Sequence, residues 1–330
     1  MLHLPVGQTV ETFRDEAPAL SESVFLVNPA AANGATGRRW PEIAHQAAGV
    51  GLVGDALLSE HRGHLGQLAR DAALGGARLL VVVGGDGAVN EVANGLAGLD
   101  DPPSVAVIPC GTGGDFVRTF GITDDVAAAA RIALNGDTQT IDLGRVTYRS
   151  WDGHEAEAVF ANVASAGMSG AIAQRANKMS KALGARASYL WATFAVFAGW
   201  SAVETRLTVD GESRSGRMFD VIVANGRYFG GGMKMCPDAS PSDGLLDVVT
   251  IGDLTKRDLV LTMPKIYRGT HLPHPKAEAL RGRVVTVETD EPMPVELDGE
   301  QPGTTPARFE VLPGALRLRV PAVGATQATG

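Results

Sequence analysis

Residues 79–96 read LLVVVGGDGAVNEVANGL, and this stretch decides the fold. The five apolar residues Leu79–Val83 predict a short strand buried on both faces of a parallel sheet. Glycines 84, 85 and 87 then predict a turn, and apolar residues from Val89 to Leu96 recur at helical spacing behind it. A glycine turn between a buried strand and a helix N-terminus presents backbone N–H groups to an anion such as phosphate.

Asp86 adds a carboxylate inside this turn. A carboxylate alone would repel a phosphate, so a divalent cation is the natural mediator between the two. The alternative is an ordinary strand-to-helix turn that uses its glycines only for geometry.

Composition describes a globular protein of two domains. The chain has 330 residues, of which 45% are hydrophobic and 20% charged. Its net charge of −8 argues against a nucleic-acid binder that depends on a basic field. Its two cysteines, Cys110 and Cys236, lie far apart and do not form a disulfide framework.

The termini and the apolar runs predict a cytoplasmic protein. Residues 1–22 carry Glu11, Asp15 and Glu16 without a sustained apolar core, so we expect an N-terminal extension and no signal peptide. The run Ala187–Ala202 is shorter than the ~20 residues of a membrane-spanning helix. Contact with a membrane surface remains compatible with this pattern.

Residues 23–137 alternate between strand and helix patterns, which predicts a doubly wound parallel sheet in an α/β nucleotide-binding domain. Strands are expected at 23–28, 55–59, 79–83 and 105–109, and helices at 39–48, 63–74, after the GGDG turn and at 126–134.

Residues 138–322 are mostly β-branched or alternating, which predicts a β-rich domain arranged as an antiparallel sandwich, followed by a tail at 323–330. Strands are expected at 140–147, 158–164, 203–209, 220–225, 246–251, 284–288, 294–297, 309–311 and 316–320, and helices within 169–199 and at 256–267. The last strand, Leu316–Val320, either closes this domain or returns to the first.

Three loops follow expected parallel strands, at Asn28–Gly34, Gly84–Gly87 and Gly111–Asp115. Loops at the carboxyl ends of such strands meet in one crevice. The dinucleotide pattern GxGxxG is absent after the first strand, and the phosphate-loop pattern GxxxxGK[ST] is absent too, so both common nucleotide folds are disfavoured.

Five segments together resemble the diacylglycerol-kinase-type lipid kinases of bacteria, a family related to the sphingosine kinases and NAD kinases. They are NPAAANG (28–34), GGDGAVNEV (84–92), PCGTGGDFVR (109–118), DGLLDV (243–248) and LDGE (297–300). The resemblance covers nearly the whole chain, with the motifs in the family's order. It implies Mg²⁺-dependent transfer of the γ-phosphate of ATP to a lipid hydroxyl, diacylglycerol first.

The resemblance also implies a role for each matching residue. Nucleotide binding falls to Asn28, Pro29, Ser59, Gly84, Gly85, Asp86, Gly87, Asn90, Glu91, Gly111 and Thr112. A metal site falls to Ser240, Asp243 and Leu245, two of them through backbone carbonyls, a mixture that suits Mg²⁺. Asp86 joins the Mg–nucleotide network, and Glu300 accepts the proton of the lipid hydroxyl.

The chemistry is coherent without the resemblance, because phosphoryl transfer needs a metal, in-line positioning and a carboxylate near the attacking hydroxyl. On a continuous strand, Asp298 and Glu300 would share a face, whereas a turn after Leu297 would separate them. Taken alone, Glu300 reads as an exposed turn carboxylate and Asp243 as part of a plain turn. The joint pattern favours the catalytic and metal-binding roles.

Two positions depart from the family's pattern. Ala88 stands where the family usually has Thr, which removes a hydroxyl that could bind phosphate, and Gly114 stands where it usually has Asn. Neither change removes the expected base or a metal ligand, so we expect altered tuning of an active enzyme; a pseudokinase is the alternative.

The expected partners are ATP and a lipid alcohol, with no nucleic acid; a homodimer stays open. Arg175, Lys178, Lys181 and Arg186 precede the apolar run 188–200, and this combination suits docking on an anionic membrane. A buried helix with a solvated basic approach is the equal alternative. His271 and His274 lack partners at metal-ligand spacing and are expected in a surface loop.

Alternative functions are a kinase of a sphingoid base or another lipid alcohol, an NAD kinase, and a nucleotide-binding regulator without turnover. NAD kinases also carry GGDG and an Asn-Glu pair, as here at Asn90 and Glu91. The C-terminal DGLLDV and LDGE segments favour a lipid acceptor.

Overall fold

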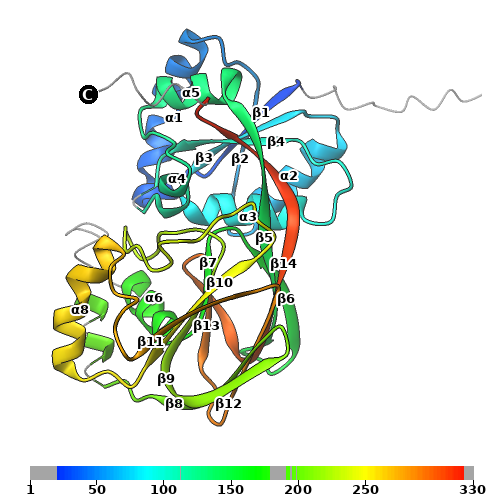
Figure 1. Cartoon of the computed structure of the whole chain (residues 1–330). Helices are drawn as coiled ribbons and strands as arrows, with labels where there is room; N and C mark the ends of the chain where they lie inside the picture. The colour runs from blue at the N-terminus through cyan, green and yellow to red at the C-terminus, as the bar shows by residue number, and fades with distance from the viewer. Residues whose placement is uncertain (1–20, 112, 179–190, 194, 198, 323–330) are drawn as a thin grey trace, which may run out of the picture.

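The computed structural model describes residues 21–111, 113–178, 191–193, 195–197 and 199–322. It contains an N-terminal domain of alternating strands and helices and a second domain rich in strands (Figure 1). The elements of the first domain are β1 (Ser23–Val27), α1 (Ala31–Gly49), β2 (Asp55–Leu58), α2 (His64–Leu74), β3 (Leu79–Gly84), α3 (Asp86–Leu96), β4 (Ser104–Pro109), α4 (Asp115–Thr119) and α5 (Val126–Asn135).

The first domain is a doubly wound parallel sheet, as predicted. Its strands lie in the order β2-β1-β3-β4, and every neighbouring pair is parallel. Alternate side chains of a strand face opposite sides of a sheet. Val24 and Leu26 accordingly pack with α2 and α3, whereas Phe25 and Val27 pack with α1 and α5. Both faces of the sheet are therefore buried under helices.

The second domain begins as the chain leaves α5. Its elements are β5 (Asp137–Ser150), β6 (Glu155–Phe160), β7 (Val163–Gly167), α6 (Met168–Lys178), β8 (Val203–Val209), β9 (Glu212–Ala224), β10 (Leu246–Gly252), α8 (Lys256–Arg268), β11 (Ala277–Gly282), β12 (Val284–Thr289), β13 (Pro294–Leu297) and β14 (Glu300–Val320).

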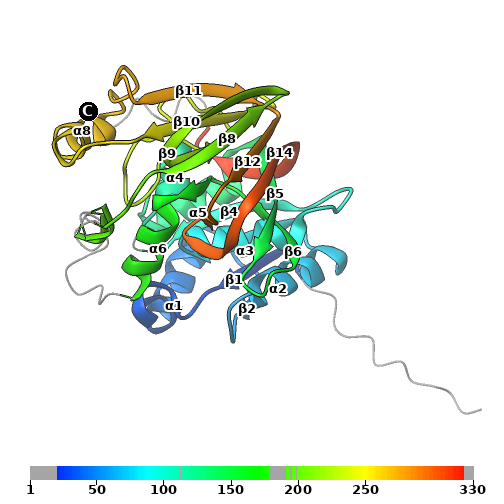
Figure 2. The same ribbon diagram turned by 90° about the horizontal axis from the view of Figure 1, so that it is seen from below.

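Six strands of this domain close on themselves. Antiparallel pairs join β7 to β9, β9 to β8, β8 to β12, β12 to β14, β14 to β13 and β13 back to β7. Figure 2 shows the curved strands of this set from below. Val221, Val285 and Phe309 are buried together in its interior. The second domain is therefore β-rich and antiparallel, as the sequence predicts, with six of its strands closed around one core.

Two long strands run through both domains. In Figure 1, β5 and β14 extend side by side from the lower domain to the upper one, and they pair from Gly303–Ser150 to Val320–Asp137. Leu318 of β14 lies opposite Val105 of β4 in a parallel pair. Leu316 and Leu318 are buried in the core of the α/β domain. The C-terminal strand therefore closes the second domain and also covers the sheet edge of the first.

Several elements differ from the sequence prediction. The loop expected at 28–34 overlaps the start of α1, but Ala32, Asn33 and Gly34 have positive φ angles and form a non-helical kink there, as a loop would. The strand expected at 158–164 is two strands, β6 and β7, separated by a bend at residues 161–162. The strands expected at 309–311 and 316–320 are both parts of β14, in which the register shifts between Leu312 and Leu316. Elements α4 and β11 were not predicted.

Among the helices that the structure describes, none is long and apolar enough to cross a membrane.

Candidate functional site

Two glycine loops meet at the start of α3. This helix begins at Asp86, directly after β3, and Gly85 precedes it. A Cβ atom placed on Gly111 would lie 2.5 Å from the Cα atom of Gly85. The loops after β3 and β4 are therefore in backbone contact, which requires glycine on both sides.

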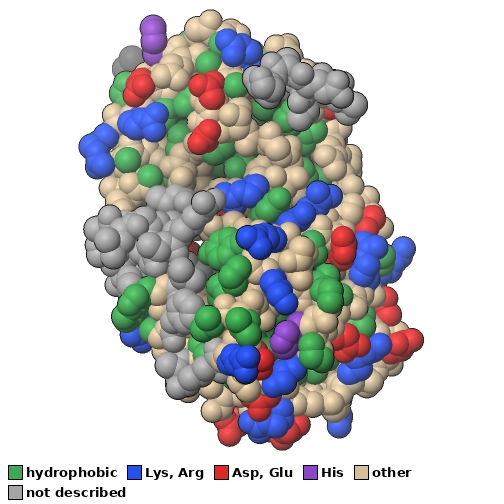
Figure 3. Space-filling model, turned by 60° about the vertical axis from the view of Figure 1, so that its left-hand side comes forward, with side chains coloured by type: hydrophobic (Ala, Val, Ile, Leu, Met, Phe, Trp, Pro, Cys, Tyr) green, Lys and Arg blue, Asp and Glu red, His purple; other side chains and the backbone are tan. Residues whose placement is uncertain are grey.

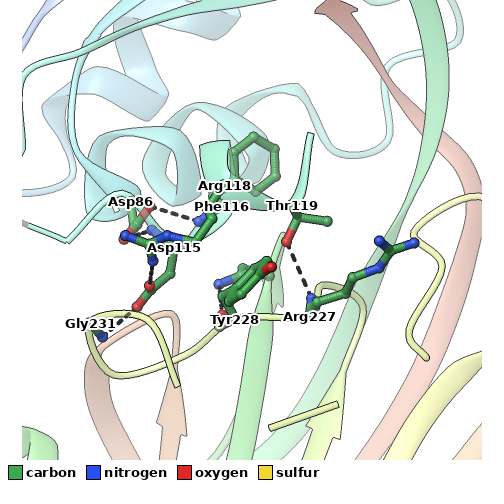
Figure 4. Close-up of polar contacts among 9 residues, drawn as sticks. Asp86, Asp115, Phe116, Arg118, Thr119, Arg227, Tyr228 and Gly231 are labelled. Atoms are coloured by element: carbon green, nitrogen blue, oxygen red, sulfur yellow. Dashed lines mark hydrogen bonds and ion pairs between the residues drawn. The ribbon is translucent and has the colours of Figure 1, made fainter. Parts of the chain in front are cut away.

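Asp86, which is half-buried, and Asp115, which is buried, form an acidic pair beside these loops (Figure 4). Asp86 accepts hydrogen bonds from the backbone N–H groups of Asp115 and Phe116, both at 3.1 Å, so its carboxylate faces the N-terminus of α4. Burial and the negative charge of Asp115 raise the pKa of Asp86 to about 6. A divalent cation bound between two neighbouring carboxylates relieves the repulsion between their negative charges. Asp86 has no ion-pair partner among the described residues, so its carboxylate is the one of the two that suits Mg²⁺.

Asp115 also bonds to the β-rich domain. Its Oδ2 accepts a hydrogen bond from the backbone N–H of Gly231 at 2.7 Å, and its Oδ1 accepts one from Arg118. The Arg118 guanidinium lies over the ring of Tyr228, 5.5 Å from its centre. Figure 4 shows the loop of residues 227–231 lying against α4 from below. The acidic pair is therefore held from both domains.

A cleft of about 750 Å³ lies between the domains. Of the residues predicted for the site, it is lined by Asn28, Pro29, Ser59, Gly87, Asn90, Glu91 and Glu300. Gly84, Gly85, Asp86 and Gly111 belong to the adjoining loops and do not line it. Thr112 lies outside the described residues. The structure thus brings seven of the expected residues together in one cleft, Gly87 from the first turn of α3 and Glu300 from β14 among them.

A tight hairpin separates Asp298 from Glu300. Leu297 of β13 pairs with Glu300 of β14, and both turn residues, Asp298 and Gly299, have positive φ angles, 47° and 94°. Glu300 consequently points into the cleft. The Asp298 side chain is half-buried and accepts hydrogen bonds from the N–H groups of residues 161, 162 and 163 at 2.7–3.0 Å. These bonds hold the bend that splits the strand expected at 158–164.

Asp298 also joins the two domains through α3. The Asn90 side chain donates to Asp298 at 2.9 Å and to the Val159 carbonyl at 3.0 Å. Glu91 accepts a hydrogen bond from the Leu65 N–H at 3.1 Å, which ties α3 to α2. Asn90 and Glu91 therefore shape the cleft through contacts that the motif alone does not reveal.

Arg62 is a cleft residue that the sequence reasoning missed. It lies three residues after Ser59, and its guanidinium forms an ion pair with Glu300 across the cleft. Arg62 lies in the turn 59–64, which follows an expected parallel strand. Polar residues in such turns face the crevice, so this position could have indicated a site residue.

The predicted metal loop lies elsewhere. Ser240, Asp243 and Leu245 do not line the cleft. Asp243 forms an ion pair with Arg281 and accepts a hydrogen bond from the Leu245 N–H at 3.1 Å. The neighbouring Gly244 N–H donates to Asp142 at 2.8 Å. Arg281 thus neutralises the one carboxylate of this loop, as Arg118 pairs with Asp115, whereas Asp86 forms no ion pair with any residue in the described part of the chain and is the better candidate ligand for a cation.

The structure gives a local reason for each of the two residues that depart from the family's pattern. Ala88 is buried in the core of the first domain, and its methyl group leaves no room for a Cβ atom on Gly84. Gly114 precedes α4 with φ +69°, a backbone conformation that favours glycine. Position 88 consequently faces the core, away from a phosphate.

The predicted position of His271 is wrong. The sequence predicts it in a surface loop, whereas the structure buries it beneath α8, and burial lowers its pKa. His274 lies close to Asp258, with 4.0 Å between Nε2 and Oδ1.

Comparison with known proteins gives matches in both domains. Residues 22–146 match the model of the diacylglycerol kinase catalytic domain, and residues 162–320 match that of the YegS C-terminal NAD kinase beta sandwich-like domain. The chain is 34% identical over 313 residues to the diacylglycerol kinase of Mycobacterium tuberculosis (strain ATCC 25618 / H37Rv), covering 91% of this chain and 95% of that protein. It is 30% identical over 242 residues to the diacylglycerol kinase of Bacillus subtilis (strain 168), covering 73% and 77%.

Solved structures share the fold. The crystal structure of a diacylglycerol kinase from Bacillus anthracis str. Sterne superposes with a TM-score of 0.67 at 22% identity, over 91% of this chain and 97% of its own. A second crystal structure from that organism reaches a TM-score of 0.74 at 24% identity, over 92% and 99%.

Proposed function

Because the chain belongs to the diacylglycerol kinase family of lipid kinases, we propose that it transfers the γ-phosphate of ATP to a lipid hydroxyl, with diacylglycerol as the first acceptor and phosphatidic acid as the product. The observation that carries this proposal is the cleft, which is lined by Gly87 at the first turn of α3 and by Glu300 of β14.

The nucleotide half of the cleft suits a triphosphate. Gly87 at the first turn of α3 lines the cleft, where the helix dipole and free N–H groups favour an anion. Asn28, Pro29 and Ser59 lie at the ends of the neighbouring parallel strands. Asp86, at the start of α3, would hold Mg²⁺, which when bound neutralises charge on the phosphates.

Glu300 suits the role of general base. Its carboxylate reaches into the cleft from a tight hairpin, which fixes its backbone position. The lipid hydroxyl oxygen attacks the γ-phosphorus, the bond from that phosphorus to the bridging oxygen of ADP breaks, and the hydroxyl proton passes to Glu300. Arg62 pairs with Glu300 from the nucleotide side and is positioned to turn toward the transferred phosphate.

A membrane surface is the proposed source of the lipid. Helix α8 exposes Val260 and Leu261 to 57% and 58%, beside the exposed basic residues Arg257, Lys265 and Arg268. The face in Figure 3 mixes hydrophobic with Lys and Arg side chains across its middle. Arg175, at the end of α6, stacks on the exposed Trp191 at 5.2 Å. A surface that combines apolar and basic groups favours binding to an anionic bilayer. Lys181 and Arg186, predicted for this role, lie outside the described residues.

The test is transfer of labelled γ-phosphate from ATP, with Mg²⁺, into diacylglycerol in mixed micelles and into a total lipid extract. We expect labelled phosphatidic acid from the wild type and a fall of about 10²–10⁴-fold in kcat for Glu300→Gln. Glu291→Gln is the matched control, because Glu291 is exposed and outside the cleft.

The outcomes separate the alternatives. Label in another lipid would assign a different lipid alcohol as the acceptor. Label in NAD would overturn the lipid acceptor. ATP binding without any labelled product would overturn the kinase function in favour of a nucleotide-binding regulator.

A further inference from the structure

A cavity of about 50 Å³ lies in the β-rich domain, apart from the cleft. Residues of α6, α8, β9 and β10 line it, together with the loops that follow β9 and α8. Its wall is apolar and rich in methionine, with Met168, Met233, Met235 and Met263. Methionine side chains are flexible and re-pack around a long apolar ligand, so the cavity can widen to admit one.

One carboxylate interrupts this apolar wall. Asp220 of β9 is buried, and its Oδ2 accepts hydrogen bonds from the backbone N–H of Ser169 at 2.8 Å and from the Ser169 hydroxyl. Its Oδ1 makes no hydrogen bond with any residue in the described part of the chain. A buried polar oxygen without a partner costs free energy, so a hydrogen-bond donor is expected from outside the protein.

The pKa of Asp220 is consistent with this setting. Burial raises it to about 7, and the hydrogen bonds from Ser169 oppose the shift. Near neutral pH the carboxyl group therefore exists in both protonation states, and its free oxygen can accept a hydrogen bond or donate one.

The cavity is linked to the kinase site by one short loop. Phe229 and Met233 line the cavity and pair with each other through two backbone hydrogen bonds of 2.9 and 3.0 Å. Gly231, at the tip between them, donates to Asp115 next to Asp86. An occupant of the cavity thus contacts the same loop that supports the acidic pair.

Resting on the proposed lipid kinase function, we infer that this cavity holds a chain of the lipid substrate and that Asp220 selects a chain carrying a hydroxyl group. A hydroxyl at the depth of Asp220 donates to Oδ1 and satisfies it. A plain methylene chain leaves that oxygen buried and unpaired. A site built around a polar partner discriminates strongly against an analogue that lacks it.

A resident water molecule is the competing occupant, because the cavity is large enough for one and Asp220 and Ser169 are polar partners. A water that stays in place would satisfy Oδ1 equally with either lipid. It would therefore remove any preference for a hydroxylated chain.

The experiment compares kcat/KM of the full chain, with saturating MgATP, for diacylglycerols of equal chain length. One carries oleoyl chains, and the others carry a single hydroxyl at different depths, including the 12-hydroxyoleoyl chain. We expect at least one hydroxylated isomer to be used about tenfold better than the dioleoyl lipid. Asp220→Leu should abolish this ratio and improve use of the dioleoyl lipid. Asp220→Asn, which keeps an acceptor oxygen, should retain part of it.

Met263→Leu is the matched control, because it alters the same wall without a polar group and should leave the ratio unchanged. The wild-type comparison alone decides the matter if Asp220→Leu fails to fold. Equal use of the plain lipid and every isomer overturns this inference and leaves the kinase function standing. Phosphorylation of no lipid overturns the proposed function itself.

Discussion

The backbone N–H of Gly231 lies 2.7 Å from Oδ2 of Asp115, so a loop of the β-rich domain is hydrogen-bonded to the carboxylate that raises the pKa of Asp86. Asp86, in turn, accepts a hydrogen bond from the backbone N–H of Asp115. The acidic pair is thus completed by residues from both domains, and its charge state is sensitive to each partner.

Asp115→Asn should lower the pKa of Asp86. The raised pKa, about 6, results from burial first and from the charge of Asp115 second, and the variant removes the second cause. The acidic limb of the pH profile of kcat/KM for ATP should therefore move below pH 6, whatever the loss in rate. An acidic limb at the wild-type pH would show that Asp86 does not control it.

Magnesium should stabilise the protein through Asp86. Because a proton competes with a cation for a carboxylate of raised pKa, the rise in Tm on adding MgCl₂ should be larger at pH 8 than at pH 5. A cation at about 100 times its Kd contributes roughly 2.7 kcal/mol. Differential scanning fluorimetry measures the shift.

Two variants distinguish the candidate metal sites. Asp86→Asn should abolish the magnesium-dependent rise in Tm, whereas Asp243→Asn should preserve it, because Asp243 is already paired with Arg281. The reverse result would move the cation to the loop of residues 240–245.

Asp298→Ala should destabilise the fold by about 3 kcal/mol or more. The change leaves the N–H groups of residues 161, 162 and 163 and the Asn90 amide without their acceptor in a buried place. Urea denaturation measures the loss. Glu300→Gln, two residues away and facing the cleft, should unfold at the wild-type urea concentration. Equal stability of the two variants would contradict the anchoring role of Asp298.

Replacing Val260 and Leu261 together by Glu should weaken binding to anionic vesicles about tenfold. Both side chains are more than half exposed, so the loss concerns membrane contact and the Tm should stay unchanged. Leu74→Glu is the control, because Leu74 is 70% exposed on α2 of the first domain. Vesicle cosedimentation measures binding. A similar loss for Leu74→Glu would show that added negative charge, and not α8, is responsible.

Local patterns predicted most of the α/β domain. The strand Leu79–Gly84 and the buried face of α3 at Val89, Val92 and Leu96 follow from apolar runs and helical spacing, which are short-range signals. The expected strand at 158–164 failed because Asp298, more than 130 residues away, binds the backbone at its centre. No local pattern reports such a partner.

The site was predictable where it lies at strand ends. Asn28, Ser59 and Gly87 follow parallel strands, and the fold brings such positions together. Arg62 carries no pattern that separates it from other exposed arginines, and its partner Glu300 is brought near only by the hairpin. His271 is a polar residue, yet it is buried against a cavity that residues of α6 and α8 also line. The surroundings of Arg62, Glu300 and His271 depend on tertiary contacts, which the sequence pattern does not contain.

The position of β14 in the sequence has a consequence for biosynthesis. This strand pairs with β12 and β13 in one domain and with β4 in the other, yet it follows all of them along the chain. While the ribosome is still translating residues 300–320, neither half has its full complement of strands, and the edge at β4 stays exposed to unwanted pairing. A nonsense mutation before the Glu300 codon would therefore remove β14 from both domains, even though residues 23–137 of the first domain had been translated.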